Sequence, residues 1–383
     1  VAVGILVMIV SLCITIGFQH EIKNKAASLA GHIQVVNSNS LYDNRSLPIQ
    51  IGDTLRDELA SLPCVSHVQR FALCPAMLKT NDAFRGIMLR GVGTDFDSYF
   101  LSSHLVSGTV PSFGTGVAPS DSILLSARLA SALELQVGDR VYAYFFDNNL
   151  RVRRFFVSGI FQTHMADFDI RLCYADIRVV QRLSRWESDQ YSGAEIVLHD
   201  FNDMDTVSAI LSSMFLARQD AYGQYYATPD IEERFPQVFS WLSLLDTNVI
   251  AILILMICVA GVTMVSGLLI IILERTRFIG IMKAMGTTDT QLRHLFLYLA
   301  SMIVLRGMFW GNVTAFVFLV LQKATGIVAL DPVSYYIDHV PVYFPWDGIV
   351  AVNIVTLAVC VLVLIVPTYI VSRIHPARSI RFE

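Results

Sequence analysis

The feature that most restricts the fold of this chain is a long apolar run, Val249–Leu273, which contains no charged residue. Because an α-helix rises ~1.5 Å per residue, this run would cross a hydrocarbon core ~30 Å thick with length to spare. Apolar runs of similar character cover residues 1–18, 295–321 and 349–371. With 54% hydrophobic and only 16% charged residues, the chain is predicted to be a membrane protein with four transmembrane helices.

The first run is just long enough to cross a membrane if a residue or two precede it. Since the chain opens on Val1 inside this run, we expect its natural start to lie further upstream. A cleaved secretory signal is the alternative interpretation, but residues 17–20 lack the small-residue cleavage pattern of such signals.

Residues 19–240 are predicted to form one soluble domain, because no run within them is apolar and long enough to cross a bilayer. Segments rich in β-branched and aromatic residues predict strands at 32–36, 65–73, 85–91, 140–146 and 151–161. Apolar residues at helical spacing predict helices at 53–62, 126–135, 176–183 and 203–216. Strands and helices interleave without βαβ regularity or internal repeats, so the expected fold class of this domain is α+β.

Basic residues predict which side of the membrane each connection faces. Four of them, Arg275, Arg277, Lys283 and Arg293, lie in the 274–294 loop, and the 372–383 tail is also basic, whereas 326–346 has neither Lys nor Arg. By the positive-inside rule, the loop and the tail are cytoplasmic. Four spans then place both chain ends inside the cell and the 19–240 domain outside the membrane.

A short amphipathic segment, Glu274–Gly286, separates the second and third apolar runs. Its apolar residues Phe278, Ile281, Met282 and Met285 recur at three- and four-residue spacing, which predicts one helical face. Gly286 predicts the end of this helix, and the absence of Gly and Pro from 274–278 predicts a stiff continuation of the second span. One interpretation is a loop whose charges merely set topology, and the other is a helix that offers an apolar face to a partner.

The residues Glu-Arg-Thr-Arg-Phe-Ile-Gly-Ile-Met-Lys-Ala-Met-Gly resemble the signature of the FtsX-like permease family, which includes the lipoprotein-releasing Lol permeases and the MacB efflux pump. The order of one span, a large extracytoplasmic domain and three further spans also agrees with that family. The resemblance implies a coupling helix that docks on the ATPase subunit of an ABC transporter. Its implied coupling residues are Glu274, Arg275, Arg277, Phe278, Ile281, Met282, Lys283, Met285 and Gly286.

The resemblance is nearest to the Lol permeases, around 266–270 and 273–277. It implies a multi-pass protein of the bacterial inner membrane that releases lipoproteins towards a periplasmic carrier. The implied partners are a separate ABC ATPase, a second copy or a related permease, the carrier and membrane lipid. MacB-like efflux of peptides or small molecules remains an alternative. FtsX-like regulation of a cell-wall hydrolase is another alternative, although the 19–240 domain is larger than that function leads us to expect.

Several chemistries are not supported by the sequence. No Gly-Lys dipeptide occurs, so a Walker A loop is missing and ATP is expected on the separate subunit, with no cofactor on this chain. No nucleophile elbow, HExxH motif or zinc-like Cys spacing is present, so neither a catalytic nor a metal site is predicted. The net charge of −4 gives no argument for nucleic-acid binding. Cys64 and Cys74 are considered as one possible disulfide.

Two further candidate functional positions are a charged residue within an apolar run and a polar loop of the soluble domain. Arg306 lies near the middle of the third run, where a charge is costly, so we expect it to pair within a dimeric bundle of spans or to accompany close helix packing. The polar loop 184–191 resembles, by position only, the hairpin with which one Lol permease recruits its carrier. Its candidate carrier-binding residues are Arg185, Trp186, Glu187 and Tyr191. The alternative is an exposed turn with one anchoring Trp.

Overall fold

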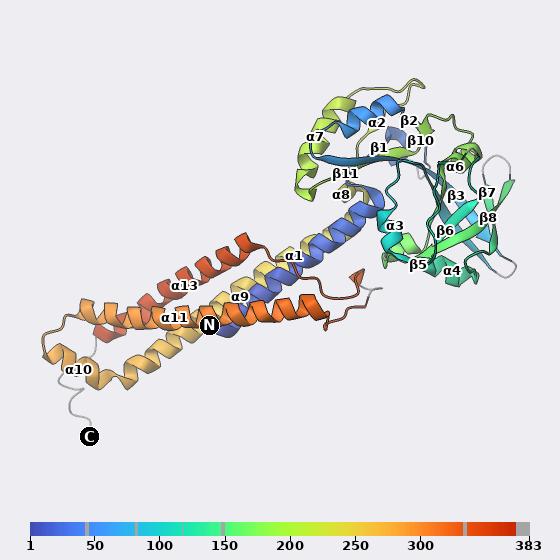
Figure 1. Cartoon of the computed structure of the whole chain (residues 1–383). Helices are drawn as coiled ribbons and strands as arrows, with labels where there is room; N and C mark the ends of the chain where they lie inside the picture. Colours follow the sequence, from blue (N-terminus) through green and yellow to red (C-terminus); the bar gives the residue numbers. More distant parts are fainter. Residues whose placement is uncertain (43–45, 81–82, 117, 147–149, 332–334, 373–383) are drawn as a thin grey trace. The chain divides into compact units, whose positions relative to one another are not determined.

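The computed structural model of the chain is shown in Figure 1. It describes residues 1–372 except 43–45, 81–82, 117, 147–149 and 332–334. Its contacts divide the chain into two compact units. One unit is helical and comprises 1–21, 238–329 and the described part of 339–383, and the other is a domain formed by 22–237 with 330–338.

Among the residues that the structure describes, four helices are long and apolar enough to cross a membrane, judged by length and composition. They are α1 (Ala2–Ala30), α9 (Pro236–Glu274), α11 (Asp289–Thr325) and α13 (Trp346–Ser372). Each contains one of the predicted apolar runs, and α1 and α9 extend well beyond their runs. In α1 the extension follows from Ile22, Ala26 and Leu29, which recur at helical spacing and are buried. The short helix α10 (Thr276–Ala284) joins α9 to α11.

The helical unit packs around buried apolar side chains from all five helices. This cluster includes Ile5 and Met8 of α1, Leu268 and Ile272 of α9, Ile279 of α10, Phe296 and Val304 of α11, and Leu364 of α13. On α11 the buried positions recur every three or four residues from Leu292 to Gln322. Other apolar residues of these helices are exposed, as is expected of spans that face lipid.

The domain is built on a ten-stranded sheet with the order β12-β1-β11-β3-β4-β9-β6-β8-β5, in which β7 pairs with both β3 and β8. The strands are β1 (Ile33–Asn37), β3 (Val65–Lys79), β4 (Phe84–Val92), β5 (Leu105–Gly108), β6 (Ser122–Ser126), β7 (Arg140–Phe146), β8 (Leu150–Phe161), β9 (Leu172–Asp176), β11 (Gly193–Leu198) and β12 (Tyr226–Ala227). The pairings close six of them, β3-β4-β9-β6-β8-β7, into a ring. Among the described strands, only β4 with β9 and β6 with β8 pair in parallel.

A two-stranded sheet, seven α-helices and two short 3-10 helices, Ser38–Leu41 and Phe201–Asp203, complete the described part of the domain. The small sheet pairs β2 (Ile49–Gln50) with β10 (Gln190–Tyr191). The helices are α2 (Asp53–Ala60), α3 (Tyr99–Ser103), α4 (Ala127–Leu133), α5 (Ala166–Asp169), α6 (Ile177–Ser184), α7 (Met204–Phe215) and α8 (Ile231–Arg234). The five predicted strands and four predicted helices are therefore confirmed, with β3 six residues longer than predicted. Cys64 and Cys74 are not joined by a disulfide, so the bridge considered between them is not formed.

Candidate functional site

The helix α10 begins after an interruption that the sequence did not predict. Arg275 leaves the α-helical conformation, with φ −100° and ψ 15°, between the end of α9 and Thr276. The Thr276 hydroxyl donates to the Leu273 carbonyl at 3.0 Å, and such a side-chain bond competes with regular helical bonding. The expected unbroken continuation of the second span is therefore wrong, and the chain turns between α9 and α10 (Figure 1).

The other end of α10 is fixed by its own backbone, as predicted. Gly286 adopts the left-handed conformation, with φ +97°, which glycine reaches without steric cost. Its N–H donates to the Lys283 carbonyl and the Thr287 N–H donates to the Met282 carbonyl, both at 3.1 Å. This pair of bonds is the Schellman arrangement that terminates helices. A capping box between Thr288 and Gln291 then starts α11.

The apolar residues of α10 are divided between two faces. Ile279 is fully buried in the cluster of the helical unit, and Met282 packs against that cluster. Phe278, Ile281 and Met285 are 44%, 47% and 69% exposed. The prediction of one face with four members is therefore wrong for Met282, and the sequence analysis did not identify Ile279 as the anchor. We call the exposed trio the α10 ridge.

The charged residues near the α10 ridge also differ in their surroundings. Glu274, Arg275 and Arg277 are exposed. The side chain of Lys283 is only 11% exposed, and its Nζ lies 2.9 Å from Oδ1 of Asp289 in the first turn of α11. Lys283 thus fastens α10 to α11, whereas Arg277 remains accessible beside Phe278.

Arg306 is exposed on α11, and no hydrogen bond or ion pair joins it to the part of the chain that the structure describes. Close packing occurs instead at its glycine neighbours. A Cβ added at Gly307 would lie 3.2 Å from Cβ of Val1, and one at Gly311 would lie 2.7 Å from the Ala2 carbonyl oxygen. These glycines let α1 and α11 approach each other. Pairing of Arg306 in a dimer stays a prediction.

An amide pair between two of the candidate spans escaped the sequence analysis. Asn312 of α11 donates to Oδ1 of Asn353 of α13 at 2.7 Å, and Asn353 donates back at 3.1 Å. Each amide also donates to a backbone carbonyl of its own helix, so all four N–H groups are used. The available signal was the presence of one Asn in each of two apolar runs.

The loop at 184–191 has the geometry of a closed turn. Arg185 is the left-handed C-cap of α6, and the Trp186 N–H donates to the Gln181 carbonyl at 2.9 Å. Arg185 and Glu187 are exposed, but Tyr191 is buried in β10 beneath the guanidinium of Arg70. The structure therefore contradicts Tyr191 as a residue that contacts a carrier.

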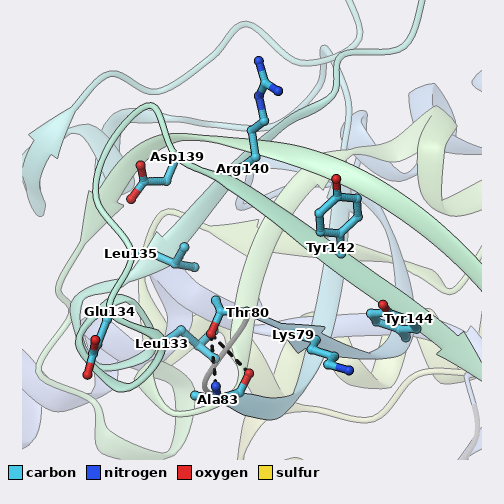
Figure 2. Close-up of a pocket in the computed structure, with 10 residues that line it drawn as sticks. All are labelled: Lys79, Thr80, Ala83, Leu133, Glu134, Leu135, Asp139, Arg140, Tyr142 and Tyr144. Atoms are coloured by element: carbon cyan, nitrogen blue, oxygen red, sulfur yellow. Dashed lines mark hydrogen bonds between the residues drawn. The ribbon is translucent and has the colours of Figure 1, made fainter.

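A cavity of about 600 Å³ opens beside β3, α4 and β7, as Figure 2 shows. Its polar lining includes Lys79, Arg140 and Asp139. Asp139 accepts the Gln136 N–H at 2.7 Å, and Thr80 bonds with Ala83 across its own turn. Two of its polar side chains thus serve the local turns.

The fold and the α10 site together define a class of protein. It is a multi-pass membrane permease whose large α+β domain lies, along the chain, between the first and second candidate spans. Residues 1–214 match the MacB-like periplasmic core domain, and residues 248–376 match the FtsX-like permease C-terminal region. Since the first match alone covers 214 of the 383 residues, the chain belongs to the FtsX-like and MacB-like family of ABC transporter permeases. The domain is accordingly a periplasmic domain.

Known relatives align over nearly the whole chain. The lipoprotein-releasing system transmembrane protein LolC of Xylella fastidiosa strain Temecula1 is 22% identical over 400 residues, covering 100% of this chain and 92% of the relative. LolC of Neisseria meningitidis serogroup B is 23% identical, with the same two coverages. LolE of Haemophilus influenzae is 20% identical and covers 99% of this chain and 91% of that protein.

Two solved structures resemble the chain at low similarity. The periplasmic region of MacB from Actinobacillus actinomycetemcomitans is 15% identical, with a TM-score of 0.37, and covers 54% of this chain and 91% of that one. The extracellular domain of the noncanonic ABC-type transporter YknZ from Gram-positive bacteria is 13% identical, with a TM-score of 0.36, and covers 52% and 99%.

Proposed function

We propose that this permease carries ATP-driven motion from a separate ATPase subunit to its periplasmic domain and thereby releases lipoproteins from the bacterial inner membrane. The observation that carries the proposal is the α10 ridge, an exposed apolar surface between the second and third candidate spans. The end-to-end similarity to proteins named for lipoprotein release favours that substrate.

In this proposal the α10 ridge and Arg277 contact the ATPase. Exposed apolar side chains beside a charge are typical of a surface that a partner covers. The ATPase binds the nucleotide, and two ATPase subunits close on each other when they bind it. We expect the complex to contain a second copy of this permease, or a related one, so that each ATPase has a permease to push.

Packing, rather than a continuous helix, would carry the displacement away from α10. The break at Arg275 removes the stiff connection to α9, but Ile279 of α10 shares a buried cluster with Ile272 of α9 and Leu292 of α11. Close-packed interiors transmit displacement because they compress little. The Lys283–Asp289 ion pair adds a second attachment, to α11.

Efflux is the second candidate function. The match of residues 1–214 to a MacB-like periplasmic core favours it, since that match covers the domain rather than the spans alone. In that case the periplasmic domain would contact a channel protein in place of a lipoprotein carrier.

The test is reconstitution of the permease and its ATPase in liposomes that hold a triacylated lipoprotein, followed by addition of carrier and assay of ATP-dependent release. We expect Arg277→Glu and Ile281→Asp to abolish release and to weaken ATPase binding. Thr290→Ala, an exposed change at the start of α11, is the matched control. Lys283→Glu alone does not separate a docking contact from local structure, because Lys283 forms an ion pair with Asp289; it needs the charge exchange with Asp289.

Each outcome separates the candidates. Release that survives both α10 variants would refute coupling through the ridge. ATP hydrolysis by an intact complex without any release would refute lipoprotein release and favour efflux or regulation of a cell-wall hydrolase.

A further inference from the structure

A cavity of about 320 Å³ lies among the helices of the helical unit. It is bordered by α1, by one face of α11 and by the start of α13. Its lining residues are Ile9, Asn312, Val313, Phe316, Val317, Leu319, Phe344, Trp346 and Ile349. Every lining side chain except that of Asn312 is aliphatic or aromatic. Neither the α10 ridge nor any predicted site residue contributes to this cavity.

Asn312 has no unused N–H group to offer a ligand. Its amide donates to Oδ1 of Asn353 at 2.7 Å and to the Met308 carbonyl at 2.8 Å, and its oxygen accepts from Asn353 at 3.1 Å. A polar ligand would lose its own hydrogen bonds on entering this cavity, whereas a hydrocarbon chain would lose none. The cavity is therefore suited to hydrocarbon, which lipid acyl chains supply within a bilayer.

The opening of the cavity is aromatic and lies towards the periplasmic side. Residues 330–338, in the connection between α11 and α13, group with the periplasmic domain. Phe344 and Trp346 follow in the same connection, and their stacked rings have centroids 6.1 Å apart. The Phe316 ring of α11 lies 5.5 Å from that of Phe344. Trp346 is 64% exposed, and an exposed Trp at the end of a span is typical of the membrane–water interface. A lipid headgroup would be at this level of the bilayer.

Lys323 places a positive charge at this opening. Its Nζ lies 5.8 Å from the centroid of the Phe344 ring, and it follows Leu319 by four residues, so both share one face of α11. Its side chain is exposed, and within the described part of the chain neither Asp347 nor any other residue forms an ion pair or hydrogen bond with it. Topology does not account for Lys323, because the positive-inside rule places basic residues on the opposite side of the membrane. An anion at the opening would give this ammonium a partner.

We propose that the cavity binds an acyl chain of a phospholipid from the surrounding bilayer, with the lipid phosphate on Nζ of Lys323. At about 30 Å³ per water-sized group, the volume holds roughly ten methylene groups of such a chain. The chain fills a space whose walls would otherwise lose their van der Waals contacts. The site is separate from the α10 ridge, and its test requires no transport.

The phosphate, rather than the acyl chain, determines which lipid is bound. Bulk lipid is as apolar as the cavity, so entry of the chain gains no hydrophobic free energy over the bilayer. A lysine beside a lipid phosphate is expected to raise affinity by about fivefold. Loss of the ammonium should therefore weaken binding of a phospholipid and leave an uncharged lipid unaffected.

The test is native mass spectrometry of the full chain in a neutral detergent. The chain is titrated with phosphatidylglycerol and, separately, with a diacylglycerol that has the same acyl chains. We expect one phosphatidylglycerol molecule to bind more tightly than any further one, and about fivefold more tightly than diacylglycerol.

Two pairs of variants separate the charge from the cavity. Lys323→Met should lower phosphatidylglycerol affinity by about fivefold without changing that of diacylglycerol, and Lys323→Arg should keep both. Val317→Trp, which fills the cavity, should weaken binding of both lipids by about fivefold or more. Val320→Trp, at an exposed position of α11 outside the lining, is the matched control and should change neither.

Three results would overturn the proposal. Equal phosphatidylglycerol affinity in the original chain and in Lys323→Met would leave Lys323 as a residue that only stabilises the end of α11. Equal affinity in the original chain and in Val317→Trp would remove the cavity from the site. Tighter binding of a triacylated lipopeptide, which has no phosphate, would assign the cavity to a lipoprotein. The exposed Lys323 variants keep the test decisive if Val317→Trp fails to fold.

Discussion

Removal of the Glu195 carboxylate should destabilise the periplasmic domain more than any loss of packing at that position. In Glu195→Ala, Arg90 loses its buried counter-charge, and Gln69 loses the acceptor that its amide reaches at 2.8 Å. Breaking a buried ion pair from one side costs about 3–5 kcal/mol. Because Gln34 and Arg90 keep their second acceptors, the carbonyls of Ala30 and Leu29, we expect the cost to come mainly from the unpaired charge.

The measurement is denaturant unfolding of the full chain, with hydrogen exchange followed in β1 and β11. The control is Arg90→Met combined with Glu195→Leu, which removes both charges and keeps similar volume. We expect the double variant to be more stable than Glu195→Ala alone, since Arg90 and Glu195 are removed together and the Arg90 guanidinium is not left without its counter-charge. A loss below about 1 kcal/mol in Glu195→Ala would contradict the argument. Simple addition of the two single effects in the double variant would contradict it as well.

Three other predictions concern separate parts of the chain. Asn353→Leu should lower the free energy of unfolding by about 1–2 kcal/mol. Adding Asn312→Leu should lower it by less than a further ~1–2 kcal/mol, because the shared hydrogen bonds are already lost; unfolding in detergent or bilayer measures this coupling energy. Lys283→Glu should weaken ATPase binding by placing two acids together, and exchange with Asp289→Lys should restore it, measured by co-purification. His32 is buried, burial lowers its pKa to about 4, and its Nδ1 accepts the Leu198 N–H, so only the unfolded state takes up a proton between pH 6.5 and 4. The free energy of unfolding should therefore fall by about 2–4 kcal/mol as the pH falls from 7 to 4, and His32→Asn should flatten that dependence in urea titrations.

The parts of α10 that depend on local chemistry could be predicted. A glycine after an amphipathic run ends a helix because it alone reaches a left-handed φ at no cost, and Gly286 does so. The break at Arg275 could not be predicted, because the Thr276 hydroxyl can donate either to solvent or to the Leu273 carbonyl, and the sequence does not distinguish the two. Likewise, spacing placed Met282 with the exposed residues, but tertiary packing turned it towards the core.

Contacts between segments that are distant in the chain could not be predicted from the sequence. Arg90 and Glu195 lie far apart in the chain, and each could equally have been a surface charge on its strand. Only the pairing order that places β11 beside β3, and β3 beside β4, brings them together. Arg234 has the same origin: its Nη1 is buried without a hydrogen-bond partner among the described residues, and a short helix, α8, sets its position.

The closed ring of six strands has a mechanical consequence. In an open sheet, a strand at the edge can slip or peel away by breaking the bonds on one side only. Within the ring β3-β4-β9-β6-β8-β7, every strand is bonded on both sides, so slippage of one requires the rupture of two ladders at once. A force applied to one strand of the ring would be distributed over all six strands. The domain would then move as a rigid body, because its strands would resist sliding past one another.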